Sequence, residues 1–159
     1  MITYNTVNVP MPAIDQSAVT DWVQRVAASY DRRVGDINFI FVDDEEILRI
    51  NREFIQHDYY TDHIGFDYCH GTTLAGDIFI GIETVASNAE QLGVEYMHEL
   101  HRVIIHGVLH LVGIQDKTPE QRQEMEAAED EALAPLYPPF RGRPKQTISP
   151  LKGESEGAG

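Results

Sequence analysis

Cysteine, basic residues and long apolar runs are all scarce in this sequence of 159 residues. The single cysteine, Cys69, excludes both an intramolecular disulfide and a Cys-x-x-Cys zinc site, which favours a reducing compartment. No apolar run reaches the length of about eighteen residues that a membrane helix needs, and residues 1–13 lack the pattern of a signal peptide. We therefore expect a cytoplasmic protein with no membrane partner.

Lysine and arginine together number 12 against 26 acidic residues, which gives a formal net charge of -14. Such a surface repels phosphates, so it argues against DNA and against broad nucleic-acid binding, and any RNA must be bound locally. Part of the acidity lies in one predicted helix near the C-terminus. We interpret its acidic residues as a solvated helix face: Glu120, Glu124, Glu126, Glu129, Asp130 and Glu131.

Hydrophobic patterning predicts a single α+β (mixed α/β) domain over residues 1–139, with a small mixed sheet of about four strands and about five helices. Residues 140–159 are rich in Pro, Gly, Ser and charge and are predicted to form a flexible tail. Strands are expected at 2–9, 37–42, 63–68 and 75–80. Helices are expected to start at Asp15 or Ser17, at Asp43 or Asp44, at Ile82, near Val94 and after Thr118. In the first helix the predicted inward residues are Ala18, Trp22, Val26 and Tyr30, with Val19 and Val23 widening the stripe. In later helices they include Ile47, Ile50 and Phe54, and then Met125, Ala128, Ala132 and Leu136.

A metal site is predicted along one helix and the turn that ends it. His106 and His110 are four residues apart, so both imidazoles project from one helical face. Gly113 can adopt a left-handed conformation that stops the helix and returns the chain toward the histidines, with Asp116 as third ligand. Three protein ligands leave one coordination position open, as in catalytic zinc sites. Zinc is the favoured ion, but the carboxylate also suits manganese, nickel or cobalt.

The same spacing is found in metzincin proteases, which carry glutamate directly after the first histidine. That glutamate is the general base of the protease. This chain has Gly107 there. A metalloprotease is therefore the weakest of the hypotheses for this site.

With glycine at this position, the segment resembles the YbeY family of bacterial endoribonucleases. The family pattern His-Gly-x-Leu-His-Leu-x-Gly is intact over residues 106–113. Residues 50–51 and 61–66 are similar to its Leu-Asn and Thr-Asp-Val-Leu-Ser-Phe segments, and residues 76–78 to its Gly-Asp-Ile strand. The resemblance covers about residues 36–135.

Two departures from the family pattern affect the site. Asp116 occupies the place of the final family histidine, so the third ligand would be a carboxylate. Ile55 occupies the place of an arginine that the resemblance implies would contact the substrate phosphate. Arg52 and His57 are weak candidates to replace it.

The remaining polar residues near the motifs have simpler interpretations. Thr61 and Asp62 can shape the cleft, but a cap and turn into the next strand is the favoured role. The other histidines lack ligand-like spacing and are predicted to be exposed: His63, His70, His98 and His101.

The resemblance implies a metal-dependent, single-strand-specific endoribonuclease that acts in maturation of small-subunit ribosomal RNA. It also implies partners in the small ribosomal subunit or among assembly proteins. The alternative is a noncatalytic ribosome-assembly module, in which the ion only fastens the end of the helix to the turn.

Overall fold

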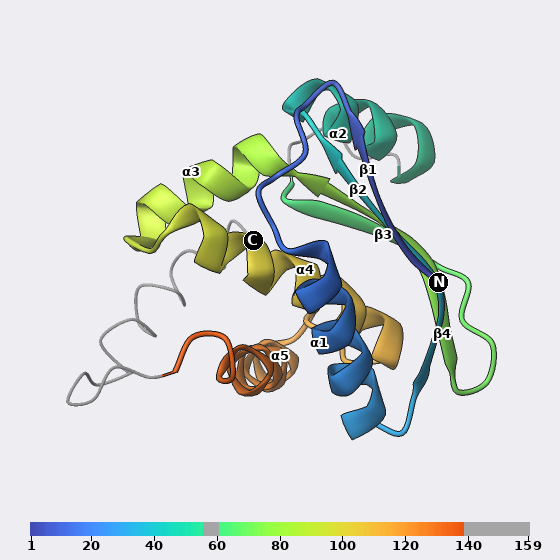
Figure 1. Cartoon of the computed structure of the whole chain (residues 1–159). Helices are drawn as coiled ribbons and strands as arrows, with labels where there is room; N and C mark the ends of the chain where they lie inside the picture. The colour runs from blue at the N-terminus through green and yellow to red at the C-terminus, as the bar shows by residue number, and fades with distance from the viewer. Residues whose placement is uncertain (56–60, 139–159) are drawn as a thin grey trace.

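The computed structural model of the chain describes residues 1–55 and 61–138. The predicted tail and His57 lie outside these ranges. In chain order the elements are β1 (Ile2–Val7), α1 (Gln16–Ser29), β2 (Arg33–Val42), α2 (Asp44–Ile50), the π-helix η1 (Asn51–Ile55), β3 (His63–Asp67), β4 (Thr73–Gly81), α3 (Ile82–Leu92), α4 (Tyr96–Val112) and α5 (Pro119–Leu133) (Figure 1).

The four strands form one mixed sheet in the order β1-β2-β4-β3. The pairs β1/β2 and β2/β4 are parallel, whereas β3 runs antiparallel to β4 at the edge. The predicted α+β class, with a small mixed sheet and five α-helices in the described residues, is confirmed. No described helix is long and apolar enough to cross a membrane.

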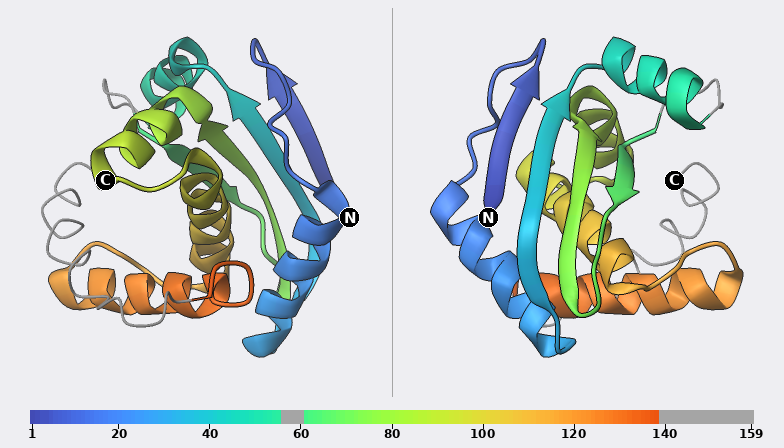
Figure 2. Two further views of the ribbon diagram at one scale, coloured as in Figure 1. Left: turned by 60° about the vertical axis from the view of Figure 1, so that its left-hand side comes forward. Right: turned by 90° about the vertical axis from the view of Figure 1, so that its right-hand side faces the viewer.

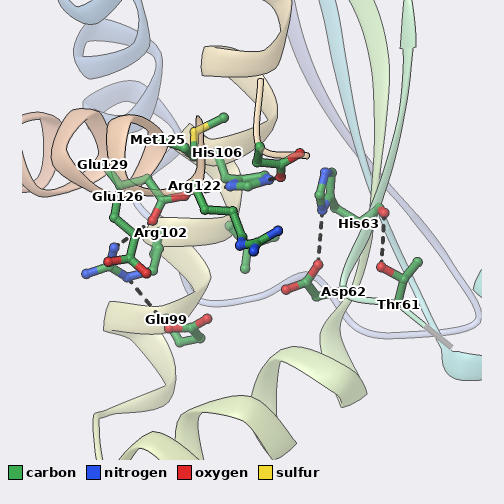
Figure 3. A pocket seen from close by; sticks show the side chains of 12 residues that line it. Thr61, Asp62, His63, Glu99, Arg102, His106, Arg122, Met125, Glu126 and Glu129 are labelled. Atoms are coloured by element: carbon green, nitrogen blue, oxygen red, sulfur yellow. Dashed lines mark hydrogen bonds and ion pairs between the residues drawn. The ribbon is translucent and has the colours of Figure 1, made fainter. Parts of the chain in front are cut away.

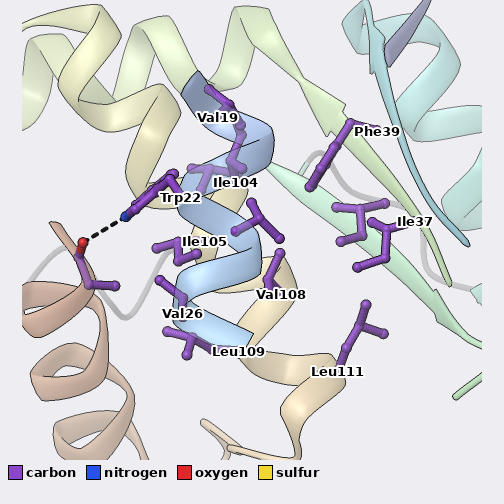
Figure 4. Packing of buried hydrophobic residues seen from close by; sticks show 14 of the residues in the cluster. Val19, Trp22, Val26, Ile37, Phe39, Ile104, Ile105, Val108, Leu109 and Leu111 are labelled. Carbon is purple, nitrogen blue, oxygen red and sulfur yellow. Dashed lines mark hydrogen bonds between the residues drawn. The ribbon is translucent and has the colours of Figure 1, made fainter. Parts of the chain in front are cut away.

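Alternation along β2 separates two hydrophobic clusters on opposite faces of the sheet. Ile37, Phe39 and Phe41 join the main core with residues of α1, α4 and α5, whereas Val42 joins a small cluster beneath α2. Figure 2 shows α4 and α5 together on one side of the sheet. Within the main core, the indole N–H of Trp22 donates to the Ala132 carbonyl at 2.8 Å and ties α1 to α5 (Figure 4).

Three of the helices begin at predicted capping residues. The Asp15 and Asp43 carboxylates each accept a backbone N–H three residues later, at 3.1 and 2.9 Å. Thr118 and Gln121 form a reciprocal capping box at the start of α5, with Pro119 in its first turn. The capping box fixes the direction in which α5 leaves the turn after α4.

Several predicted inward positions were wrong. Ala18 is exposed, because the buried stripe of α1 is centred on Trp22 and includes Val19 and Val23, which were predicted to widen it. Phe54 is 61 % exposed, since the wider π-helical turn of η1 rotates it away from the stripe that α2 begins. Leu136 lies beyond the end of α5 and is 37 % exposed, so Leu133 completes the buried face.

Candidate metal centre

Helix α4 carries the two predicted histidine ligands on the face that also bears Glu99 and Arg102. The imidazole centroids of His106 and His110 are 4.6 Å apart, one helical turn from each other. Both side chains are half-buried, while Ile104 and Val108 on the opposite face of α4 are buried in the main core. Packing of the apolar face against the sheet therefore fixes the direction in which both rings point.

The turn after α4 brings Asp116 to both rings. Gly113 adopts the predicted left-handed conformation, with φ of 118°, and its N–H bonds to carbonyls of the last helical turn. Asp116 Oδ2 then lies 3.2 Å from the Nε2 atoms of both His106 and His110. Two atoms that ligate one tetrahedral zinc ion at about 2.0 to 2.1 Å are about 3.4 Å apart. The three side chains thus converge at a spacing that fits a shared ion.

Glu129 of α5 orients the first histidine from behind. Its Oε2 lies 2.6 Å from His106 Nδ1, which directs Nε2 of that ring toward Asp116. The other oxygen, Oε1, accepts from Arg102 at 2.7 Å. Metal-bound histidines commonly have such a carboxylate on their second nitrogen.

The prediction of a solvated acidic face was wrong for Glu129, which is 5 % exposed. A sequence signal was available. Glu129 shares the helical stripe of the buried residues Met125, Ala132 and Leu133, so its position on α5 was inward.

His63, at the start of β3, completes a cluster of three imidazoles and was missed. Its ring centroid lies 4.6 Å from that of His106 and 5.7 Å from that of His110. One potential ligand atom from each of the three histidines lies within 4.8 Å of the others. The predicted exposure of His63 was wrong, because pairing of β3 with β4 places its side chain under α4.

Asp62 contacts Nδ1 of His63, just as Glu129 contacts Nδ1 of His106. Its Oδ1 lies 3.0 Å from His63 Nδ1, and its Oδ2 accepts from Asn88 at 3.4 Å. Burial would raise the pKa of the Asp62 carboxyl, but the hydrogen bond to His63 and nearby imidazole charge lower it overall. Asp62 is therefore ionised and lies inside the site.

The metal-free site holds one positive charge between the carboxylates. Burial disfavours the His106 imidazolium, but hydrogen bonds to Asp116 and Glu129 outweigh burial and raise the pKa of His106 to about 10. The same His106 contact lowers the pKa of Asp116, while burial and the charge of His106 lower the pKa of His110. A bound divalent ion would take the place of this proton.

A pocket opens between β3, α4 and α5, and its polar lining is mainly acidic. Asp62, Glu99, Glu126 and Glu129 line it together with two cationic side chains, Arg102 and Arg122. Arg102 is held by ion pairs to Glu99, Glu129 and Asp130. Arg122, in the first turns of α5, donates to the Lys117 carbonyl at 3.1 Å and reaches into the pocket (Figure 3).

Comparison with known proteins identifies the family. The sequence profile described as Endoribonuclease YbeY matches residues 4–137. Proteins named Endoribonuclease YbeY from Bacteroides thetaiotaomicron and Phocaeicola vulgatus are 56 % and 57 % identical to this chain, and each alignment covers 84 % of this chain and 97 % of the relative. The chain belongs to the YbeY family.

A solved structure has the same fold. The solution structure of a Thermotoga maritima protein superposes with a TM-score of 0.63 at 23 % identity, covering 91 % of this chain and 100 % of that one. Membership in the YbeY family confirms the prediction of an endoribonuclease and favours it over both the protease and the noncatalytic module.

Gly107, which the YbeY pattern shares, is required by packing as well. A Cβ atom at Gly107 would lie 2.9 Å from Ile78 Cγ2 and 3.1 Å from Ile78 Cδ1, because α4 lies directly against β4. A glutamate at this position would be driven into the sheet. The protease arrangement of His-Glu-x-x-His is thus incompatible with this contact between helix and sheet.

The candidate replacements for the YbeY arginine lie in different places. Arg52 is exposed in η1 and does not line the pocket, and His57 lies outside the described residues. Arg122 was not predicted from the sequence, yet it lines the pocket beside His106 and Asp116. It is the better-placed cation for a substrate phosphate.

Of the remaining histidines, His70 is exposed as predicted, but the other two are not. His98 stacks on Tyr137, with ring centroids 4.1 Å apart. His101 is half-buried, with Nδ1 2.8 Å from the Met97 carbonyl oxygen and 2.9 Å from the Tyr137 hydroxyl. These two rings contact Tyr137 after the end of α5 and do not line the pocket between β3, α4 and α5.

Proposed function

We propose that this protein uses one divalent ion, held by His106, His110 and Asp116, to cut single-stranded ribosomal RNA during maturation of the small subunit. The observation that carries the proposal is the placement of Asp116 Oδ2 at 3.2 Å from both histidine Nε2 atoms. Membership of the YbeY family supports the reaction class. The ribosomal substrate follows from the family resemblance of the sequence motifs.

Zinc is the proposed ion. Two imidazoles and one carboxylate leave a zinc site with a net charge of +1, and a fourth position remains for water or a phosphate oxygen. Such an ion lowers the pKa of bound water and stabilises negative charge that develops on phosphate. The carboxylate makes the site harder than an all-imidazole site, so manganese, nickel and cobalt are the alternatives to test.

The side chains around the ion have separate tasks. Glu129 keeps His106 in the tautomer that presents Nε2 to the ion. Arg122 is positioned to bind a phosphate oxygen through a guanidinium that the Lys117 carbonyl anchors. Arg52 and His57 become the next candidates if Arg122 has no effect on RNA binding.

We further propose that the protein acts in the cytoplasm with a partner from the small ribosomal subunit or its assembly proteins. A net charge of -14 repels RNA over most of the surface, so contacts with a partner protein would bring the substrate close. The proposal includes no DNA substrate and no membrane partner.

The decisive experiment compares His110→Ala with His70→Ala, a substitution of an exposed histidine. We expect His110→Ala to lose both bound metal and cleavage of single-stranded ribosomal RNA, and His70→Ala to keep both. Full cleavage by metal-free His110→Ala protein would refute the proposal.

Removal of the ion by a chelator separates catalysis from a purely structural role. Loss of cleavage with a nearly unchanged melting temperature is expected for a catalytic ion. Unfolding on chelation, in a protein that never cleaved RNA, would instead support the assembly module.

A further inference from the structure

We infer that His63 is a fourth protein ligand, so that the ion in this chain is bound by three imidazoles and one carboxylate. The inference rests on the proposed metal site and extends it to β3. The family pattern quoted above has valine at this position, between Thr-Asp and Leu, and this chain has histidine.

The backbone directs the His63 side chain toward the site. Ile64 and Phe66 belong to the cluster beneath α2, so alternation along β3 turns His63 to the opposite face, toward α4. Only 19 % of the His63 side chain is exposed. Its ring lies edge-on to His106 and stacks on His110.

Distances within the cluster fit one ion. Ligand atoms from His63, His106 and His110 lie within 4.8 Å of one another. Two ligand atoms of a tetrahedral zinc ion with bonds of about 2.1 Å are about 3.4 Å apart, so the imidazole nitrogens must approach one another by at most about 1.4 Å. Small movements of the side chains are therefore enough to bring all three nitrogens into bonding range.

The hydrogen bond from Asp62 decides which nitrogen faces the ion. His63 Nδ1 is hydrogen-bonded to Asp62 Oδ1 at 3.0 Å, which leaves Nε2 as the ligand atom. Glu129 does the same for His106 at 2.6 Å. Two of the three imidazoles thus have the carboxylate partner that is typical of metal-bound histidine.

The fourth ligand changes how the ion meets its substrate. Four protein ligands complete a tetrahedral zinc site, so a water or phosphate oxygen must enter as a fifth ligand. The set of three imidazoles and one carboxylate also holds the ion more tightly than the set without His63.

The test compares His63→Val, which restores the family residue and suits a strand, with His70→Val on an exposed position. X-ray absorption of the zinc-loaded proteins should count three imidazoles in the unaltered and His70→Val proteins and two in His63→Val. Zinc affinity, measured by chelator competition, should fall at least about tenfold in His63→Val only, since even loss of an outer partner commonly costs about 10 to 100-fold.

Equal imidazole counts and equal zinc affinities in His63→Val and the unaltered protein would overturn the inference while leaving the proposed function intact. If the unaltered protein binds no stoichiometric zinc, the proposed site itself fails. His63→Gln, which retains a polar side chain of similar length, gives the same comparison if circular dichroism shows that the valine variant does not fold.

Discussion

The candidate metal centre has a helical side and a strand side, and each contains a carboxylate that orients an imidazole. On the helical side, Glu129 and His106 are 23 residues apart in the sequence. On the strand side, Asp62 and His63 are adjacent. On the helical side, the two histidines are close together in the sequence and the orienting carboxylate is distant. On the strand side, the carboxylate is adjacent to its histidine, but that histidine is distant in the sequence from the other two.

This difference shows what short-range sequence patterns can and cannot give. Spacing within one helix identifies His106 and His110 because the backbone geometry of a helix is fixed. Nothing local indicates that β3 will bring His63 to the same place. Asp62 and His63, although adjacent in the sequence, were therefore predicted to be a turn residue and an exposed histidine.

The largest effect is expected for Asp116→Ala, which removes the proposed carboxylate ligand between His106 and His110. We expect a large fall in zinc affinity, because the only negatively charged ligand is lost and the imidazoles of His63, His106 and His110 alone remain. Asp116→His, which restores the family residue, should retain zinc. Chelator competition measures the zinc affinity of both variants, and an unchanged affinity in Asp116→Ala would show that Asp116 is not a ligand.

A smaller loss is expected for Glu129→Gln. The carboxylate that orients His106 is lost while the shape of the side chain is kept, so zinc affinity should fall about 10 to 100-fold. Glu124→Gln makes the same change on the exposed face of α5 and should have no effect. An unchanged zinc affinity in Glu129→Gln would mean that the helical side does not depend on its orienting carboxylate.

The pH dependence of zinc binding follows from the raised pKa of His106. Because this pKa is about 10 in the metal-free protein, His106 must lose a proton to bind zinc at neutral pH. Zinc affinity should rise about tenfold per pH unit between about pH 7 and 9, with release of about one proton per ion. Calorimetry in buffers of different ionisation enthalpy measures the proton release. If no proton is released on zinc binding, His106 is not protonated in the metal-free protein.

The raised pKa of His106 also makes the stability of the metal-free protein depend on pH. This stability should fall as the pH rises, whereas zinc affinity should increase. A folded-state pKa of about 10 lies above the unfolded value of about 6.5, so His106 stabilises the fold fully below about pH 6.5. That contribution should be lost as the pH rises toward 10. Urea unfolding of metal-free protein across this range measures it, with His106→Gln as the control that should lack this dependence.

The smallest effect is expected for Gly107→Ala, at the contact between α4 and the sheet. The added methyl group would lie 2.9 Å from Ile78, and such overpacking costs about 1 to 3 kcal/mol. The gain in helix propensity, about 1 kcal/mol, offsets only part of this cost. Urea unfolding should show net destabilisation, whereas Gly65→Ala, where a Cβ meets no atom within 4 Å, should be nearly neutral.

Much of the fold could be predicted because its signals are local. The capping residues Asp15, Asp43 and Thr118 mark helix starts through hydrogen bonds that span three residues. The errors arose where neighbouring elements decide the outcome. Phe54 left its predicted face at a π-helical turn. Strand β2 began at Arg33 rather than at residue 37, because Arg33 and Val34 pair with β4 before β1 joins the sheet.

The candidate site divides in the same way. The sequence by itself determined that His106, His110 and the turn at Gly113 point toward Asp116, since helical periodicity and a left-handed glycine act over a few bonds. Only the tertiary structure decided that Glu129 is buried behind His106 and that His63 stands opposite. The reason is physical: the burial of a polar side chain and the choice of its partner depend on which surfaces pack together, and here the packing of α4 between β3 and α5 made that choice.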